Sequence, residues 1–350
     1  MKLIQVKVRE FRQETSDTYS LVLERHPELA SYEAGQFVNV HCQIGEKEVQ
    51  RSYSFSSAPS IEEFPVLTIK RVPQGEVSNF LFETVNVGST LTISQPLGRF
   101  VLDANASAGH SLMLAGGSGI TPIFGLIKEG LHRSNTGEYT LIYANRNEDI
   151  IFQKAIEKLI TAYPDRLQVH YFLENGKLAE SKGMVHEGRL SLEFLSGLMK
   201  EFQLNAEKMM AYACGPGPMM DLCLNWLGEL SVSPEQIRTE NFTTSLSLDE
   251  NDEVDQVASS RVHVLNLKGE EIALEVPQNK DILTEFLERG YAMPHSCREA
   301  MCGSCEARLV EGEVDMRLNY ALTDAKLKDG LILLCQSFPI SEDVTIEYAS

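Results

Sequence analysis

The alternation of hydrophobic and polar positions divides the chain into three blocks. In residues 1–104, β-branched and aromatic side chains alternate with polar ones in six short segments, such as LIQVKVREF and PVLTIKRV. Glycine, proline and asparagine separate these segments, as is typical of antiparallel strands. One helical stretch, VSNFLFETV, interrupts them. The pattern predicts a closed antiparallel β-barrel.

Residues 105–242 combine short apolar runs with helical patterns. The runs HSLMLAGG and YTLIYANR are bounded by Gly and Asn, as buried parallel strands are. Helical patterns such as TPIFGLIKEGLHR and FQKAIEKLITAY lie between the runs. This alternation of strand and helix predicts a doubly wound α/β domain.

A polar segment separates the second block from the third. Residues 243–258 hold five acids and no base, which predicts a flexible acidic linker, with a long acidic loop inside a domain as the alternative. Residues 259–350 begin with a hairpin pattern that turns at Lys268 and Gly269, and a helical stretch, DILTEFLERG, ends on a glycine. This order of elements predicts a small β-grasp domain.

Composition and charge exclude several classes of partner. Hydrophobic residues make up 43% of the 350, so each block can form a core. The formal net charge of −19 gives no general attraction for nucleic acid or for an anionic membrane. The chain has no apolar run of the roughly 18 residues that a membrane-spanning helix needs, and its N-terminus lacks the apolar region of a signal peptide. We therefore expect a cytoplasmic protein whose thiols stay reduced.

Four cysteines in the third block carry the strongest chemical signal. Cys297, Cys302 and Cys305 have the spacing C-x4-C-x2-C, and Cys335 follows after 29 residues. This is the ligand spacing of a plant-type 2Fe-2S cluster. A disulfide or zinc site is the alternative, but zinc sites usually repeat C-x2-C pairs. Cys42, Cys214 and Cys223 are left as thiols.

In the first block, two short motifs suit a flavin nucleotide. Arg51, Ser52, Tyr53 and Ser54 end a predicted strand. An arginine binds a phosphate, a tyrosine stacks on a flat ring, and a serine hydroxyl bonds a ring nitrogen. Gly75 to Ser78, including Val77, open the helical stretch, and a helix N-terminus binds a diphosphate. The alternative for Ser78 is a simple helix cap.

In the second block, two glycine loops suit a nicotinamide nucleotide. Gly116, Gly117, Ser118 and Gly119, followed by Thr121, lie between a strand and a helix. A second loop of the same kind contains Cys214, Gly215 and Pro216. Such loops present free N–H groups to phosphates at the carboxyl ends of strands. Taken alone, each glycine loop is equally well interpreted as a tight turn without a ligand.

Together these motifs resemble those of the ferredoxin–NADP reductase superfamily over essentially the whole chain. The order of flavin, nicotinamide and ferredoxin domains resembles the reductase components of multicomponent oxygenases, in particular those of phenylacetyl-CoA epoxidase and 3-ketosteroid 9α-hydroxylase. The resemblance implies hydride transfer from NAD(P)H to the flavin, then single-electron transfer through the cluster to a partner oxygenase. A flavin is needed between the two because nicotinamide gives electrons in pairs and the cluster accepts one.

The resemblance also implies roles for single residues. Arg51, Ser52 and Tyr53 would bind the flavin, and Ser54 would bond its reactive nitrogen. Ser52 favours FAD, because FMN members of the family usually have Thr there. Cys214 would approach the nicotinamide ring. The remaining residues of the two helix-opening loops would hold the phosphates: Gly75, Val77, Ser78, Gly116, Gly117, Ser118, Gly119, Thr121, Gly215 and Pro216.

Three further positions are weaker matches to the family. Glu240 and Phe242 match the acid and the aromatic residue that end the nicotinamide domain near the flavin, although Phe242 would also suit a core position. Arg146 follows a predicted strand and would meet the 2′-phosphate of NADPH. Arg146 also occurs in members that prefer NADH, and it would equally suit a loop cap or a pair with Glu148 or Asp149, so the choice of nucleotide stays open.

Two other functions fit the same motifs. The same electron path would serve another acceptor, such as a hybrid-cluster protein or a haem-thiolate monooxygenase. A protein that binds flavin and cluster would also suit a redox sensor, although both nucleotide loops favour an enzyme. The sequence of such a reductase does not indicate the substrate of its partner oxygenase, because the reductase contacts only the partner.

Overall fold

The chain forms two compact units, residues 1–242 and 243–350, and each is described by itself. The computed structural model describes residues 3–103, 109–178, 180–201, 205–206, 208–242, 258–267, 270–295, 298, 300, 303–317, 319, 321–322 and 324–348. Of the predicted acidic linker, only Ala258 lies within the described residues. No described helix is both long and apolar enough to cross a membrane.

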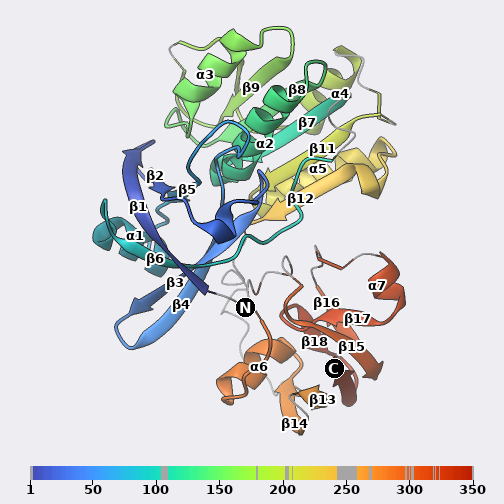
Figure 1. The fold of residues 1–350 in the computed structure, drawn as a ribbon. Coiled ribbons are helices and arrows are strands. Elements are labelled where there is room, and N and C mark those ends of the chain that lie inside the picture. The colour runs from blue at the N-terminus through green and yellow to red at the C-terminus, as the bar shows by residue number, and fades with distance from the viewer. Residues whose placement is uncertain are drawn as a thin grey trace. The chain divides into compact units, whose positions relative to one another are not determined.

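The first unit begins with a six-stranded antiparallel barrel in the order β4-β3-β6-β1-β2-β5 (Figure 1). An isolated bridge between Phe55 and Leu67 joins the end of β4 to β5 and closes the barrel. Buried and exposed side chains alternate along β1, as its sequence predicts. The barrel strands are β1 (Leu3–Gln13), β2 (Thr18–Leu23), β3 (Phe37–Ile44), β4 (Lys47–Ser54), β5 (Val66–Lys70) and β6 (Thr90–Ser94).

Two helical elements accompany the barrel. The short 3₁₀ helix η1 (Pro27–Leu29) follows β2, and α1 (Glu76–Thr84) follows β5. Val77 and Leu81 of α1 pack into the barrel core. The predicted helical stretch is therefore confirmed, and its N-terminus is fixed to the barrel by apolar packing.

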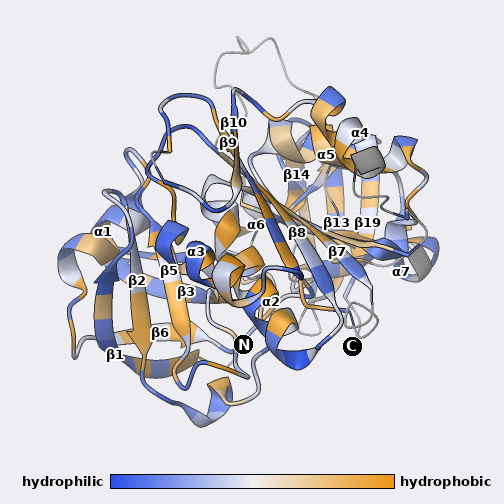
Figure 2. Cartoon of the chain, turned by 90° about the horizontal axis from the view of Figure 1, so that it is seen from above, coloured by the Kyte–Doolittle hydropathy of each residue, from blue (hydrophilic) through white to orange (hydrophobic). Residues whose placement is uncertain are grey.

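The second half of this unit is a parallel sheet in the order β10-β9-β8-β7-β11-β12. Its central strands β7 and β8, which are labelled in Figure 2, are buried along most of their length, as strands covered on both faces are. The strands are β7 (His110–Gly116), β8 (Glu138–Asn145), β9 (Leu167–Leu173), β10 (Met184–Glu187), β11 (Met210–Gly215) and β12 (Ile237–Asn241). The sequence did not predict β10 and β12, because MVHE and IRTEN lack the apolar run of a central strand.

Helices cover both faces of this sheet. On one face α2 and α3 share a core with alternate residues of β7, β8 and β9, and on the other face α4 and α5 share a second core. The helical elements are η3 (Gly117–Gly119), α2 (Ile120–Arg133), α3 (Gln153–Ala162), α4 (Leu192–Glu201), α5 (Gly217–Glu229) and η4 (Pro234–Gln236). The predicted doubly wound fold is confirmed, and its strand order reverses between β7 and β11.

Helix α2 also joins the barrel to the parallel sheet. Lys128 of α2 forms an ion pair with Glu62 of the barrel loop, and Ser60 Oγ donates to Glu129 Oε1 at 2.6 Å. A Cβ atom on Gly125 would lie 3.1 Å from Ser57 O, so helix and loop are in close contact. These contacts fix α2 against the barrel loop that follows β4.

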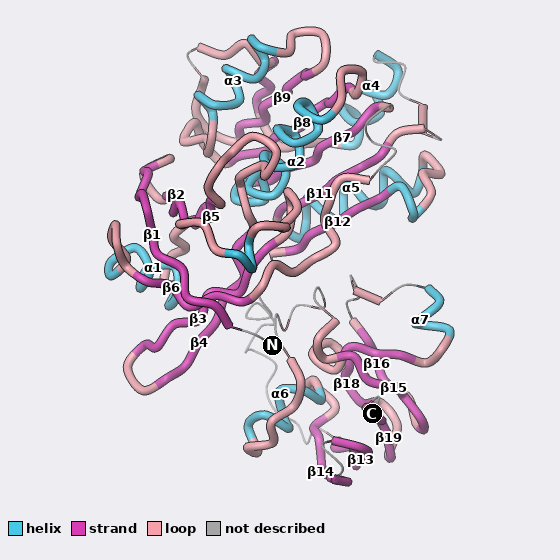
Figure 3. Tube along the Cα trace, in the orientation of Figure 1, coloured by secondary structure: helices cyan, strands magenta, loops and turns pink. Residues whose placement is uncertain are grey.

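The second unit is built on a five-stranded sheet in the order β14-β13-β19-β15-β17. Figure 3 labels β13, β14, β15 and β19 of this sheet. A two-stranded ribbon, β16 with β18, and two helices complete it. Gly290, at φ +88°, ends α6 as predicted. The predicted turn at residues 268–269 lies outside the described residues. The elements are β13 (Ser259–Leu267), β14 (Glu270–Pro277), α6 (Ile282–Glu288), β15 (Glu306–Glu311), β16 (Val314–Met316), α7 (Asp324–Lys328), β17 (Leu331–Leu333), β18 (Ser337–Pro339) and β19 (Asp343–Glu347).

Candidate functional site

The predicted flavin motif lies on the last four residues of β4. Burial increases along it, from half-buried Arg51, Ser52 and Tyr53 to fully buried Ser54. Ser52 Oγ donates to Asn39 Oδ1 of β3 at 2.7 Å, and the Arg51 guanidinium donates to Gln50 O at 2.8 Å. Burial raises the pKa of the Tyr53 phenol, so it stays neutral. The motif therefore offers a cation, a neutral aromatic ring and a hydroxyl in sequence along one strand.

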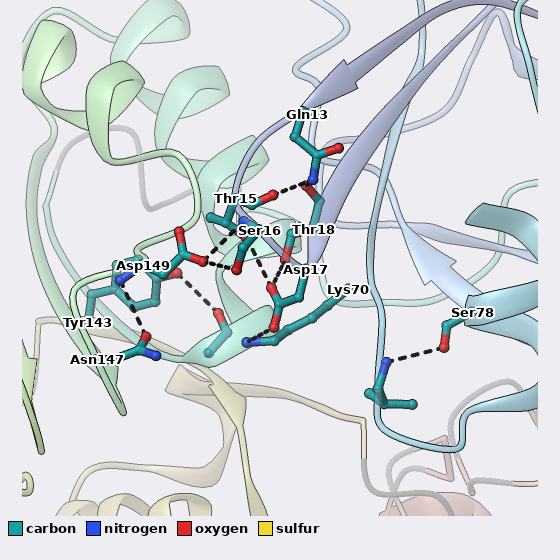
Figure 4. A network of polar contacts seen from close by, with 12 residues as sticks. Gln13, Thr15, Ser16, Asp17, Thr18, Lys70, Ser78, Tyr143, Asn147 and Asp149 are labelled. Atoms are coloured by element: carbon teal, nitrogen blue, oxygen red, sulfur yellow. Dashed lines mark hydrogen bonds and ion pairs between the residues drawn. The ribbon is translucent and has the colours of Figure 1, made fainter. Parts of the chain in front are cut away.

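The second predicted flavin element is the N-terminus of α1. Gly75 is the N-cap residue and has no side chain to satisfy the first N–H groups of the helix. A Cβ at this position would lie 2.3 Å from Val72 Cγ2 and 2.5 Å from Ser78 Oγ, so any other residue would have to displace these two side chains. Ser78 Oγ accepts from Val72 N at 3.3 Å (Figure 4). The side chain of Val77 is in the barrel core, which leaves only its N–H group for a ligand.

Sequence reasoning missed a basic residue beside this helix end. Arg71 Nε donates to Asn79 Oδ1 at 3.0 Å, and its guanidinium lies over the Phe82 ring at 4.2 Å. Asn79 Nδ2 in turn donates to Gly75 O at 2.7 Å. Arg71 is thus held beside the N-terminus of α1, where its charge favours a bound anion. The signal for it was the run KRV just before the glycine motif.

The two predicted nucleotide loops lie against each other where the strand order reverses. A Cβ on Gly119 would lie 2.1 Å from Cys214 O, and one on Gly116 would lie 2.6 Å from Pro216 Cδ. A Cβ on Gly215 would lie 3.1 Å from Gly116 N. The glycines therefore allow the β7 and β11 loops to approach closely. Both loops lead into helix N-termini, η3 with α2 and α5, as a phosphate site requires.

Side-chain hydrogen bonds stabilise the conformation of the first of these loops. Thr121 Oγ1 donates to Ser118 O at 3.0 Å, and Gly117 takes the left-handed φ of +52°. Tyr143 of β8 donates its hydroxyl to Gly117 O at 3.2 Å. The sequence alone does not single out Tyr143, because an aromatic residue in a buried strand is usually a core residue. Both side-chain bonds end on carbonyl oxygens of the loop, so neither side chain occupies a loop N–H group.

Ser54, Glu240 and Cys214 meet at the junction of the barrel and the sheet. Ser54 Oγ donates to Glu240 Oε2 at 2.7 Å, although 186 residues separate them. Glu240 of β12 lies opposite Cys214 of β11 in the parallel register, and all three residues are at most 2% exposed. Burial, and then the charge of Glu240, raise the pKa of the Cys214 thiol well above its usual range. Cys214 thus stays a neutral thiol.

Phe242 and Arg146 lie elsewhere on the nucleotide domain. Phe242 is half-buried and packs against the core between the sheet and α2, which fits the alternative of a core residue. Arg146 is exposed just after β8, and within the described part of the chain no ion pair engages its side chain. Asp149 instead accepts hydrogen bonds from the N–H and the hydroxyl of Ser16 (Figure 4). The flavin contact of Phe242 and the phosphate contact of Arg146 stay predictions.

The predicted cluster site lies in the second unit. Cys305 and Cys335 are both buried in one hydrophobic core, and Leu334 N donates to Cys305 O at 3.2 Å. Arg298, Ala300 and Gly303 have φ values of 60°, 57° and 70°. Left-handed residues turn N–H groups into a concave anion-binding surface, which suits a cluster held by thiolates. The loop and the two cysteines therefore fit a 2Fe-2S cluster, while Cys297 and Cys302 lie outside the described residues.

Comparison with known protein families and relatives matches all three parts of the chain. Residues 4–102 match the oxidoreductase FAD-binding domain, residues 113–224 the oxidoreductase NAD-binding domain and residues 265–339 the 2Fe-2S iron–sulfur cluster binding domain. The ferredoxin reductase component of 3-ketosteroid-9-alpha-monooxygenase from Mycolicibacterium smegmatis is 33% identical over 99% of this chain and 97% of that protein. The chain belongs to this family of three-domain flavin and iron–sulfur reductases.

Two further matches extend the comparison. One component of the 1,2-phenylacetyl-CoA epoxidase of Escherichia coli is 29% identical over 91% of this chain and 88% of that protein. The structure of full-length CYP116B46 from Tepidiphilus thermophilus is similar with a TM-score of 0.66 and 26% identity, over 98% of this chain and 42% of that one. The predicted fold and the cofactors FAD and 2Fe-2S are thereby confirmed.

For a reductase of this family, the geometry separates three tasks. When bound, the flavin accepts a hydride and releases single electrons, which links the nicotinamide nucleotide to the cluster. The α1 N-terminus and the loop after β7 would bind the phosphates of the flavin and of the nicotinamide nucleotide. Holding these phosphates would position the isoalloxazine and nicotinamide rings. Ser54, Glu240 and Cys214 are buried together and would keep water away from the place where the two rings meet.

Proposed function

We propose that the chain is the reductase component of a multicomponent oxygenase. It takes a hydride from a nicotinamide nucleotide onto FAD and passes single electrons through its 2Fe-2S cluster to a separate oxygenase component. The hydrogen bond from Ser54 to Glu240 carries the proposal, because it joins the end of the flavin motif to the strand beside Cys214. In the proposed roles Ser54 bonds the flavin, Cys214 lies on the nicotinamide and Glu240 orients both.

The residues that hold the cofactors follow from the same geometry. Arg51, Tyr53 and the α1 N-terminus with Arg71 bind FAD. The loops at residues 116–121 and 214–216 bind the nicotinamide nucleotide. The four thiolates are the cluster ligands, two of them in the buried positions Cys305 and Cys335. The cluster requires four reduced thiols to bind iron, and thiols stay reduced in the cytoplasm. We therefore also propose a cytoplasmic location.

The partner is supported by relatives rather than by this chain alone. The two relatives are components of a ketosteroid monooxygenase and of a phenylacetyl-CoA epoxidase. Residues 259–350 carry 16 acidic and nine basic side chains, so an acceptor with a basic surface would fit them. The test is reconstitution of the purified reductase with the oxygenase component encoded beside its gene. Nucleotide oxidation coupled to product, slowed at high salt, is expected; no stimulation by any encoded oxygenase would overturn the assignment.

One observation favours a second acceptor. The similar chain of CYP116B46 is more than twice as long as its matched part, and its name is that of a cytochrome P450. A haem-thiolate monooxygenase is therefore the second candidate partner. Reduction of a purified P450 at a rate that exceeds that with the encoded oxygenase would favour it.

Arg146 provides a test of nucleotide choice. Its exposed guanidinium follows the carboxyl end of β8, where the adenosine ribose binds in α/β folds. Arg146→Ala should raise the KM for NADPH about tenfold and leave that for NADH within about twofold, because only NADPH carries a 2′-phosphate. Lys177→Ala, which removes another exposed cation, is the control. Equal effects on both nucleotides would remove Arg146 from the 2′-site.

A further inference from the structure

The last described residue of the chain, Tyr348, is buried in the same core as two predicted cluster ligands. It follows β19 directly, and its N–H donates to Leu265 O at 3.2 Å, which continues the sheet. Its side chain is 8% exposed and packs in the core that contains Cys305 and Cys335. Neither the domain matches nor the site motifs assign a role to this tyrosine.

The sheet register makes Tyr348 a neighbour of Cys305. β15 and β19 are antiparallel, with Arg308 opposite Glu347. One step further along, Ala307 comes opposite Tyr348, and Cys305 lies two residues beyond on the same face. Cys305, Ala307 and Tyr348 are all buried, as one face of a sheet requires. Diagonal neighbours of this kind are within reach of an aromatic side chain.

The Tyr348 hydroxyl is a buried, unsatisfied hydrogen-bond donor. Among the described residues it has no hydrogen-bond partner. A buried hydroxyl without a partner costs stability, so it needs an explanation. It is therefore a buried donor on the face of the sheet that carries Cys305 and Ala307.

We propose that the Tyr348 hydroxyl donates a hydrogen bond to the sulfur of Cys305 when that sulfur is an iron-bound thiolate. A thiol is a weak acceptor, whereas a thiolate carries charge and accepts more strongly. The bond stabilises the reduced cluster more than the oxidised one, because reduction adds negative charge to the sulfurs. Tyr348 is thus a positioning residue that makes the cluster easier to reduce by the flavin. The proposal rests on the ligand role of Cys305 proposed above.

The test compares Tyr348→Phe with the unaltered reductase by redox titration followed by electron paramagnetic resonance. Phenylalanine keeps the packing and removes only the hydroxyl. The one-electron equilibrium constant for cluster reduction should fall about tenfold, which is about 59 mV toward more negative potential. Thr345→Val removes a hydroxyl from the other face of β19 and should leave the potential unchanged.

A second readout separates the hydrogen bond from a packing effect. In D₂O, the resonance Raman bands of the Fe–S(Cys) stretches should shift in the unaltered protein, and part of this shift should disappear in Tyr348→Phe. An unchanged potential and an unchanged isotope shift in Tyr348→Phe would overturn the proposal. If the unaltered protein itself held no cluster, the ligand assignment would fail instead, so the two failures are distinguishable.

Discussion

The two redox sites differ in how the sequence encodes them. The cluster site is local: three of its four predicted cysteines fall within nine residues. The nucleotide junction is assembled from strands far apart in the chain, with 186 residues between Ser54 and Glu240. The cluster site needs one loop and the core that holds Cys335, both within one unit, whereas the junction depends on the docking of the sheet against the barrel. Changes at the cluster should therefore act on one cofactor, and changes at the junction should act on the step between two.

The largest expected effect is at the cluster. Cys305→Ala should abolish the cluster signal and electron delivery to the oxygenase, because a thiolate ligand is lost. Flavin content and ferricyanide reduction by the nicotinamide nucleotide should stay within about twofold. Visible absorption and electron paramagnetic resonance provide the measurement. Cys42→Ala, another buried thiol, is the control, and a cluster that survives in Cys305→Ala would contradict the ligand assignment.

At the junction the effect should be smaller and shared between residues. Ser54→Ala and Glu240→Gln should each slow hydride transfer to the flavin by about tenfold to hundredfold, since each disturbs a buried charged hydrogen bond. The double variant should be little slower than either single one, because both remove the same bond. Anaerobic stopped-flow absorption measures these rates.

The control for the junction is Glu48→Gln, on the exposed end of the same strand as Ser54. It should leave the rate unchanged. If the rate losses of Ser54→Ala and Glu240→Gln multiply in the double variant, the two residues act independently. The hydrogen bond between them would then not be the cause of either effect.

A third change tests the local character of the second unit. Glu285 of α6 is buried and accepts from Lys280 Nζ and Arg289 Nε, both at 2.8 Å and both within five residues. The hydrogen bond from Lys280, and then that from Arg289, lower the pKa of the Glu285 carboxyl despite its burial. Glu285→Gln should lower the free energy of unfolding of this unit by about 1–2 kcal/mol at pH 7.

The pH dependence of this loss has a definite sign. Because the folded pKa is lowered, the stabilisation is complete above the unfolded pKa of about 4.3 and disappears as pH falls through the folded value. Urea unfolding at a series of pH values should therefore show the full difference between the two proteins at pH 7, and this difference should shrink as the pH is lowered through the folded pKa. Glu288→Gln removes an exposed partner of Lys280 and should change the stability by less than about 0.5 kcal/mol. An equal loss in both variants would contradict the role of burial.

The difference between the sites also explains what the sequence predicts. Glycine loops and cysteine spacings are contiguous in the sequence, so the sequence predicts them together with their elements. The same holds for the cap at Gly290 and for the helical stretch TPIFGLIKEGLHR, which lies within α2. The bond between Ser54 and Glu240 follows only from packing of the two domains. Tyr143 and Arg71 act through neighbours brought close by the sheet and by α1. β10 and β12 were missed because edge strands need few apolar residues.

The most direct test of the proposed reductase is an anaerobic titration of the purified protein with NADH and, separately, with NADPH, followed by visible absorption and electron paramagnetic resonance. One nucleotide is expected to bleach the flavin, and the rhombic signal of a reduced 2Fe-2S cluster should then appear. A protein that demonstrably holds flavin and cluster, yet is reduced by neither nucleotide, would contradict the reductase and favour a redox sensor.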